Sequence, residues 1–381
     1  MKTLLPILIA VFIAATGYGV SFPLLGLQVE RVAASGWMLG MNAAMPALGW
    51  VVGSLLVPVL QLRLRIPIGV LAVAFLVCAG LAATGLRYAD AFLDMTVLRF
   101  FFGGGMGLFF RSVEYWINGL SPDHVRGRNL AINGIAFMGG LVVGSAAQPA
   151  LGAEGWVPFG FVLAAIVLAA FGTAFWPKLA LPSAITPSFS AAWACVAAIP
   201  AAYAAGLAYG LYESVPAYLN QIYALRNGLE ADVAAYALTA AALGNILIPL
   251  PVAMLSDRIG RRAPLIACAC VTGVVALFVP KTLATPYLFL FAVMVCAGSA
   301  GTVYGLGLAL IGDRFRGADL VTANAGFGLV YAAASIAGPL INGSALDALN
   351  THGLVVSSAL IFGCLVTFLV VFGPGAFARK G

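Results

Sequence analysis

Long apolar segments, separated by short polar loops, run through the whole sequence. Of its 381 residues, 62% are hydrophobic and 8% are charged, whereas a soluble domain carries about 25% charged residues. A water-soluble core cannot hide so much apolar surface, and about 20 apolar residues let a helix span a bilayer. We therefore expect an all-α integral membrane protein with twelve transmembrane helices, at about 4–27, 37–61, 67–86, 92–119, 129–151, 157–176, 192–222, 232–256, 263–280, 285–311, 319–346 and 353–375.

Basic residues predict how these segments are oriented. An even number of spans places both termini on one side of the membrane. If that side is the cytoplasm, thirteen basic residues lie in inner loops and tails and four in outer loops, so the positive-inside rule predicts cytoplasmic termini. The thirteen are Lys2, Arg63, Arg65, Arg126, Arg128, Lys178, Arg258, Arg261, Arg262, Arg314, Arg316, Arg379 and Lys380, and the four are Arg31, Arg87, Arg226 and Lys281. A basic inner face beside an anionic leaflet explains the net charge of +6 without nucleic acid.

Residues typical of metal sites and catalysis are sparse. The six cysteines lie inside apolar runs and are interpreted as packing residues. Cys268 and Cys270 point different ways on a helix, and His124 and His352 fall in different loops. The sequence contains no Walker A motif and no histidine within a span. We expect no cofactor, no metal and no enzymatic activity.

The two halves of the sequence resemble each other. GYGVSFP at 17–23 matches GLYESVP at 210–216, Arg126-Gly127 recurs as Arg316-Gly317, and Gly49 recurs as Gly244. The offsets are close to half the chain, and both copies begin on the same side. We predict two parallel six-helix bundles, residues 1–176 and 191–381, joined by a cytoplasmic linker at 177–190 that is rich in proline and serine.

Three short motifs carry a family resemblance. SDRIGRR at 256–262 is similar to the Asp-Arg-x-Gly-Arg-Arg signature between helices 8 and 9 of the major facilitator superfamily, and LRFFFGG at 98–104 resembles its helix-4 motif. QLRLR at 61–65 keeps the arginines of the first-half signature but lacks its aspartate and glycine. The resemblance covers the full length. It implies a monomeric secondary transporter of a bacterial inner membrane, whose two halves rock around a central site lined by helices 1, 4, 7 and 10.

The signature after helix 8 has two interpretations. Its residues are Asp257, Arg258, Gly260, Arg261 and Arg262. Asp257 can accept hydrogen bonds from an arginine or a helix N-terminus, and Gly260 permits a sharp turn. Such a contact would hold the cytoplasmic side closed as a gate. Alternatively, the arginines only fix the topology.

Two spans carry the charges expected within the bilayer. In helix 4, the residues Arg99, Gly103, Gly107, Arg111, Glu114 and Asn118 form a polar stripe. This stripe suits either a water-filled cavity or close contact with another helix. Arg111 and Glu114 are spaced to pair, either as a cytoplasmic gate or as a structural ion pair.

Glu213 in helix 7 has no basic residue within one turn of its own helix. Because burial disfavours the charged form of a carboxylate, Glu213 is the preferred candidate for a proton carrier, with Glu114 next. The alternative is a structural pair of Glu213 with Arg99 or Arg111.

Further polar side chains could line a substrate cavity. The candidates are Tyr18, Arg99, Arg111, Tyr209, Asn245, Tyr304, Asn324 and Tyr331. Each could instead form an interhelical hydrogen bond. The expected function is proton-coupled transport of a small molecule by alternating access. A uniporter and a non-transporting receptor on the same fold are the alternatives, and the sequence does not identify the substrate.

Overall fold

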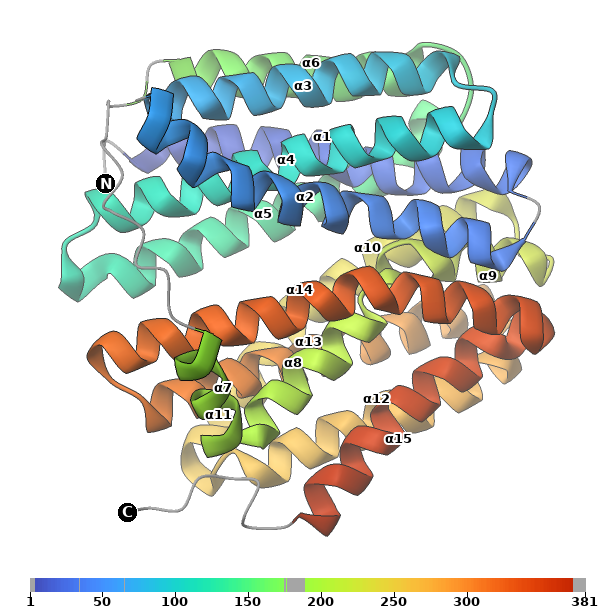
Figure 1. Ribbon diagram of the computed structural model, residues 1–381. Helices are drawn as coiled ribbons and strands as arrows, with labels where there is room; N and C mark the ends of the chain where they lie inside the picture. Colours follow the sequence, from blue (N-terminus) through green and yellow to red (C-terminus); the bar gives the residue numbers. More distant parts are fainter. Residues whose placement is uncertain (1–3, 34, 65, 175, 177–188, 373–381) are drawn as a thin grey trace. The chain divides into compact units, whose positions relative to one another are not determined.

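The computed structural model describes residues 4–33, 35–64, 66–174, 176 and 189–372. Within them the chain forms helices and no strand (Figure 1). Ten helices of this described part are long and apolar enough to cross a membrane. The predicted all-α membrane fold is therefore confirmed. Residues 177–188 of the predicted linker and the C-terminal residues 373–381 lie outside the described residues.

The chain divides into two compact units. The first unit contains residues 1–34 and 41–184, and the second contains 35–40 and 185–381. Helices α1 to α6 comprise α1 (Leu4–Val32), α2 (Gly36–Leu64), α3 (Ile68–Tyr88), α4 (Phe92–Leu120), α5 (Asp123–Leu151) and α6 (Val157–Ala174). These correspond to the first six expected spans, and most extend a few residues beyond the expected ends.

The second half contains more elements, several of them short. They are α7 (Phe189–Ala198), α8 (Pro200–Tyr212), a π-helix η1 (Val215–Leu219), α9 (Asn220–Arg226), α10 (Ala231–Leu247), α11 (Pro249–Ile259), α12 (Arg262–Thr282), α13 (Pro286–Arg314), α14 (Gly317–Ala348), a 3-10 turn η2 (Asn350–His352) and α15 (Gly353–Val371). Prolines stand at the first position of α8, α11 and α13, where the missing N–H has no helical partner to lose.

The seventh expected span, 192–222, is not one continuous helix. It breaks at Ile199, whose φ of −149° and ψ of 65° lie outside the helical region, which a following proline disfavours. It changes to a π-helix around Pro216, which lacks the N–H that a regular helix needs. The eighth span is divided at Ile248, directly before Pro249, although the backbone of Ile248 keeps helical angles, with φ of −87° and ψ of −42°. These interruptions are caused by prolines inside apolar sequence.

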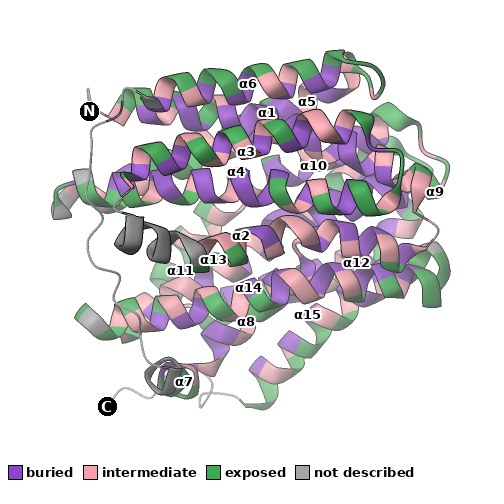
Figure 2. Cartoon of the chain, turned by 45° about the horizontal axis from the view of Figure 1, so that its top comes forward, coloured by how far each residue is buried: buried purple, intermediate pink, exposed green. Residues whose placement is uncertain are grey.

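The same helix pairs pack together in both units. In the first unit α1 packs on α5, and α3 packs on α4 and α6. In the second unit α8 packs on α14, and α12 packs on α13 and α15. Each pair in the first unit thus has its counterpart about half a chain later, which agrees with the internal repeat. Figure 2 shows exposed residues along α3 and α6, as well as on helices of the second half such as α15.

Recurring glycines explain a further repeated pair, in which α2 packs on α4 and α10 packs on α13. A Cβ atom built at Gly49 on α2 would lie 2.3 Å from the carbonyl oxygen of Phe100 on α4, and one at Gly244 on α10 would lie 2.0 Å from that of Met294 on α13. No side chain fits at such distances. The backbones of each pair therefore touch, as small residues allow between membrane helices.

Residues 35–40 are grouped with the second unit because the start of α2 lies against α14. Asp347 near the end of α14 accepts hydrogen bonds from the backbone N–H groups of Gly36, at 2.6 Å, and Trp37, at 2.8 Å. A carboxylate is a good acceptor for the unpaired N–H groups at a helix N-terminus. Gly343 is also in backbone contact with Gly36, with a built Cβ 2.3 Å from its carbonyl oxygen.

Many large apolar side chains are exposed. Examples are Leu81 and Val371, each 70% exposed, and Phe171, which is 67% exposed. Water would penalise so much apolar surface, whereas lipid tails do not. This pattern supports a multi-pass membrane protein.

We predict that Gly244→Ala destabilises the protein by about 1–3 kcal/mol, because the added methyl group forces α10 away from α13. Gly305→Ala on α13 is the matched control, since no atom lies within 4 Å of a Cβ built there. The control should be neutral or gain up to about 1 kcal/mol from helix propensity. Thermal unfolding of the detergent-purified variants measures the difference. Equal midpoints for the two variants would contradict the backbone contact.

Candidate functional site

Glu213 lies where the seventh span changes from α8 to the π-helix. It is partly buried, and its backbone N–H closes the last turn of α8 on the carbonyl of Tyr209. Its side chain is bound by α14, because the hydroxyl of Tyr331 donates a hydrogen bond to Glu213 Oε2. The partner of this carboxyl group within the second unit is thus a neutral phenol.

Three tyrosines from three helices form an aromatic cluster beside Glu213. The ring centroids of Tyr209 and Tyr331 are 6.2 Å apart with nearly parallel planes, at 16°. Tyr304 on α13 lies edge-on to Tyr331 at 5.3 Å and also contacts Tyr209 at 5.2 Å. Phe327 extends the cluster, 5.1 Å from Tyr304. The structure therefore brings together four of the predicted site residues, namely Glu213, Tyr209, Tyr304 and Tyr331.

Asn342 stabilises the irregular backbone next to Glu213. Its Nδ2 donates to the carbonyl oxygen of Leu211 at 2.8 Å and to Ser214 Oγ at 3.3 Å, and its Oδ1 accepts from Ser357 Oγ at 2.7 Å. Where a proline interrupts the helical ladder in a membrane, a neighbouring side chain must satisfy the released groups. The sequence alone does not assign this role to Asn342.

The predicted ion pair of α4 is present. Arg111 Nη1 lies 2.6 Å from Glu114 Oε2, and both side chains are nearly half exposed. Arg111 also lies over the ring of Tyr115, 5.6 Å from its centroid. Farther along the stripe, Gly103 and Gly107 pack against Pro46 and Trp50 of α2. For these two glycines the structure favours close helix contact over a water-filled cavity.

The remaining cavity candidates have other surroundings within their own units. Tyr18 packs in an aromatic group of the first unit, with Phe22 at 4.6 Å and Phe102 at 5.9 Å. Arg99 is buried. Asn245 lies against α13, where its Oδ1 would be 2.0 Å from a Cβ built at Gly301. Asn324 is exposed on α14.

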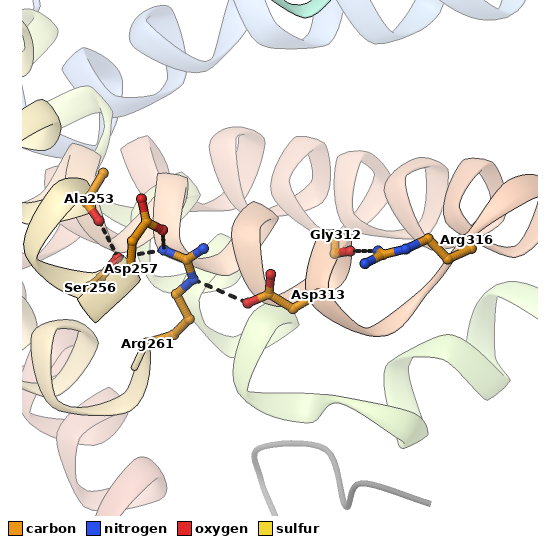
Figure 3. Close-up of polar contacts among 7 residues, drawn as sticks. All are labelled: Ala253, Ser256, Asp257, Arg261, Gly312, Asp313 and Arg316. Atoms are coloured by element: carbon orange, nitrogen blue, oxygen red, sulfur yellow. Dashed lines mark hydrogen bonds and ion pairs between the residues drawn. The ribbon is translucent and has the colours of Figure 1, made fainter. Parts of the chain in front are cut away.

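The signature after helix 8 is organised around Arg261 (Figure 3). Its Nη1 pairs with Asp257 Oδ1, and its Nε donates to Asp313 Oδ2 at 3.1 Å. Nη1 also donates to Ser256 Oγ at 2.6 Å. Arg261 thus ties the end of α11 to the end of α13. Asp313 could not be identified from the sequence, because no motif around residue 313 indicates contact with Arg261, 52 positions earlier.

Gly260 makes the turn that positions Arg261. Its φ of 88° lies in the region that glycine tolerates, as the sequence predicts, and it ends α11. Burial opposes the charge of Arg261, but the hydrogen bonds that it donates to Asp313 and Asp257 raise its pKa above the ordinary value. Arg258 and Arg262 are exposed. The side chains of residues 61–64 in the first-half counterpart are outside the described part of the structure, as is Arg65.

Comparison with known proteins matches this architecture. A model of the Major Facilitator Superfamily matches residues 201–380. The MFS-type transporter YfkF of Bacillus subtilis (strain 168) is 27% identical over 284 residues, which cover 73% of this chain and 72% of YfkF. Both matches support the assignment of this chain to the major facilitator superfamily. The ten long apolar helices of the described residues are those of a multi-pass membrane protein.

Solved structures show the same fold. The nucleoside transporter NupG superposes with a TM-score of 0.76 at 13% sequence identity, covering all of both chains. A D-xylose-proton symporter superposes with a TM-score of 0.73 at 17% identity, covering 100% of this chain and 98% of the symporter. At such low identity the likeness establishes the fold alone and leaves the substrate open.

We predict that Asn342→Ala destabilises the protein by about 1–3 kcal/mol, because the carbonyl of Leu211 loses the hydrogen bond that Asn342 donates to it. Asn324→Ala on the same helix is the control and should change stability by less than about 0.5 kcal/mol, since Asn324 is exposed. Thermal unfolding in detergent compares the two. If Asn342→Ala unfolds at the same temperature as the control, Asn342 does not support the π-helix.

Proposed function

We propose that this superfamily member is a proton-coupled secondary transporter that moves a small molecule by alternating access, with Glu213 as the proton carrier. The observation that carries the proposal is the hydrogen bond between Glu213 and Tyr331. A D-xylose-proton symporter shares this fold, which also supports proton coupling.

A phenol is a suitable partner for a carboxyl group that gains and loses a proton. A hydroxyl group both donates and accepts hydrogen bonds. Tyr331 can therefore donate to the carboxylate of Glu213 and accept from the carboxylic acid. An arginine partner has donors only and would stabilise the ionised state. The pair of Glu213 and Tyr331 thus allows protonation without leaving a polar group unpaired in the membrane.

Glu114 is less suited to the same task. Its carboxylate is held by the guanidinium of Arg111 at 2.6 Å, so protonation would cost a charge-assisted hydrogen bond. We assign this pair a gating or structural role at its end of α4.

The orientation of the transporter follows from its charges. We propose cytoplasmic termini, a cytoplasmic linker at 177–190 between six-helix bundles at 1–176 and 191–381, and a location in a bacterial inner membrane. The support is the excess of basic residues in the loops assigned to the inside. With this orientation, the cluster around Arg261 lies on the cytoplasmic side.

Glu213→Gln keeps the shape of the side chain but cannot titrate. We expect the variant, in proteoliposomes, to exchange substrate across the membrane but to lose accumulation driven by a pH gradient. Glu114→Gln is the matched control and should retain accumulation. A substrate identified by a thermal-shift screen serves both assays.

Three results would count against the proposal. Wild-type accumulation by Glu213→Gln under the same gradient would remove Glu213 as the carrier. Loss of exchange together with accumulation would assign Glu213 a structural role. Gradient-independent uptake by the wild-type protein would identify a uniporter.

We further propose that the cluster around Arg261 holds the cytoplasmic side closed. Asp257→Asn weakens the pair with Arg261, so it should shift the resting protein toward an inward-open state. The exposed pairs contribute at most about 1 kcal/mol each, so folding should be little affected. Distances between spin labels on the cytoplasmic face report the shift. Asp232→Asn is the control, because Asp232 is an exposed acid at the start of α10. An unchanged distribution of spin-label distances in Asp257→Asn would show that the cluster around Arg261 does not hold the cytoplasmic side closed.

A further inference from the structure

A polar cavity of about 430 Å³ lies where α1 and α3 end. This is within the range of about 300–1,000 Å³ typical of small-molecule sites. Its lining comes from the ends of α1 and α3, the start of α4 and the segment between α5 and α6, and includes Gln28, Arg31, Arg87, Asp90 and Glu154. All of these belong to the first unit, whereas Glu213 and its tyrosines belong to the second.

The charges of this cavity are of both signs. Two guanidinium groups, of Arg31 and Arg87, and two carboxylates, of Asp90 and Glu154, border it. Arg31 Nη2 and Glu154 Oε1 are 3.0 Å apart, with side chains 59% and 78% exposed. An ion pair so exposed contributes little stability, so both groups can bind a ligand instead of each other. The set suits a ligand that carries one positive and one negative group.

Arg87 is held in place by aromatic rings. Its guanidinium carbon lies 5.8 Å from the ring centroid of Tyr88 and 6.0 Å from that of Trp156. Such stacking restrains the guanidinium, which presents paired N–H donors that match the oxygens of a phosphate group. Nε of Arg87 is buried and has no hydrogen-bond partner among the described residues, so one donor of this guanidinium is left unsatisfied there.

The surroundings are those of a membrane–water boundary. Tyr88 is 65% exposed and Trp156 is 44% exposed, next to the apolar side chains of Leu93 and Val157, which are 67% and 65% exposed. Tyrosine and tryptophan collect at the level of lipid headgroups, with lipid-facing apolar residues beside them. The cavity therefore opens among side chains that fit a lipid headgroup.

We propose that this cavity binds the phosphoethanolamine headgroup of a membrane phospholipid. The phosphate is bound by Arg87 and Arg31, and the ammonium group donates hydrogen bonds to Asp90 and Glu154. A phosphatidylglycerol headgroup offers the phosphate without the cation. A phosphatidylcholine headgroup has a cation without N–H donors, so it cannot satisfy the carboxylates. Phosphatidylethanolamine matches both sets.

The test titrates each of these three lipids into the purified full-length protein in detergent and follows binding by native mass spectrometry and thermal unfolding. Phosphatidylethanolamine should bind tightest and raise the unfolding temperature most. Arg87→Gln should weaken its binding about tenfold, as expected for one lost charge-assisted contact. Asp90→Asn should remove the preference over phosphatidylglycerol while leaving phosphatidylglycerol binding unchanged. Lys281→Gln in the second unit is the matched control and should bind as the wild type does.

Equal binding of the three lipids, or an unchanged preference in both Arg87→Gln and Asp90→Asn, would overturn the proposal. Asp90 is exposed, so Asp90→Asn should fold normally. This variant therefore tests the proposal even if Arg87→Gln does not fold. Glycerophosphoethanolamine, the soluble headgroup without acyl chains, distinguishes the source of the ligand. Weak protection by this compound supports a lipid, and protection equal to that of the lipid would overturn the lipid in favour of a free zwitterion.

Discussion

A carboxyl group inside a membrane needs a polar partner, and Glu213 finds one in the hydroxyl of Tyr331 on α14. The contact requires α8 and α14 to approach until their backbones touch. Gly210 and Gly338 permit this, since Cβ atoms built there would lie 2.8 Å from the carbonyl oxygen of Tyr331 and 2.3 Å from that of Leu211. The same approach brings Asn342 to the backbone that Pro216 interrupts. Glycines, tyrosine and asparagine on two helices thus form one connected arrangement around Glu213.

Much of the fold can be predicted from the sequence because the bilayer restricts what an apolar segment can do. Apolar length alone locates the helices, and the match of Gly49 to Gly244 locates two equivalent helix crossings. The turn at Gly260 follows from glycine in the signature motif. The breaks at Ile199 and Ile248 were not predicted, because the apolar length of a segment contains no information about how a proline changes the neighbouring backbone.

The site was predicted in part, for a related reason. Helical spacing places Tyr209 and Glu213 on one face of their span, so their proximity follows from the sequence. The partners of these residues come from other helices. Tyr331 is 118 residues from Glu213, and Asn342 is 131 residues from Leu211. Which side chains meet across two helices depends on the crossing point, and the sequence of one helix does not contain that information. The partner of Arg261 on α13, Asp313, was not predicted for the same reason.

The central claim is that Glu213 changes its protonation state while it stays hydrogen-bonded to Tyr331. Infrared difference spectroscopy of the protein in lipid, recorded as the pH is stepped, measures this directly through the C=O stretch of a protonated carboxyl group. The account predicts a titrating band that disappears in Glu213→Gln and shifts in frequency in Tyr331→Phe, because the hydrogen bond to the carboxyl group is lost. A wild-type spectrum without a titrating carboxyl band, or a band that persists unchanged in Glu213→Gln, would contradict it.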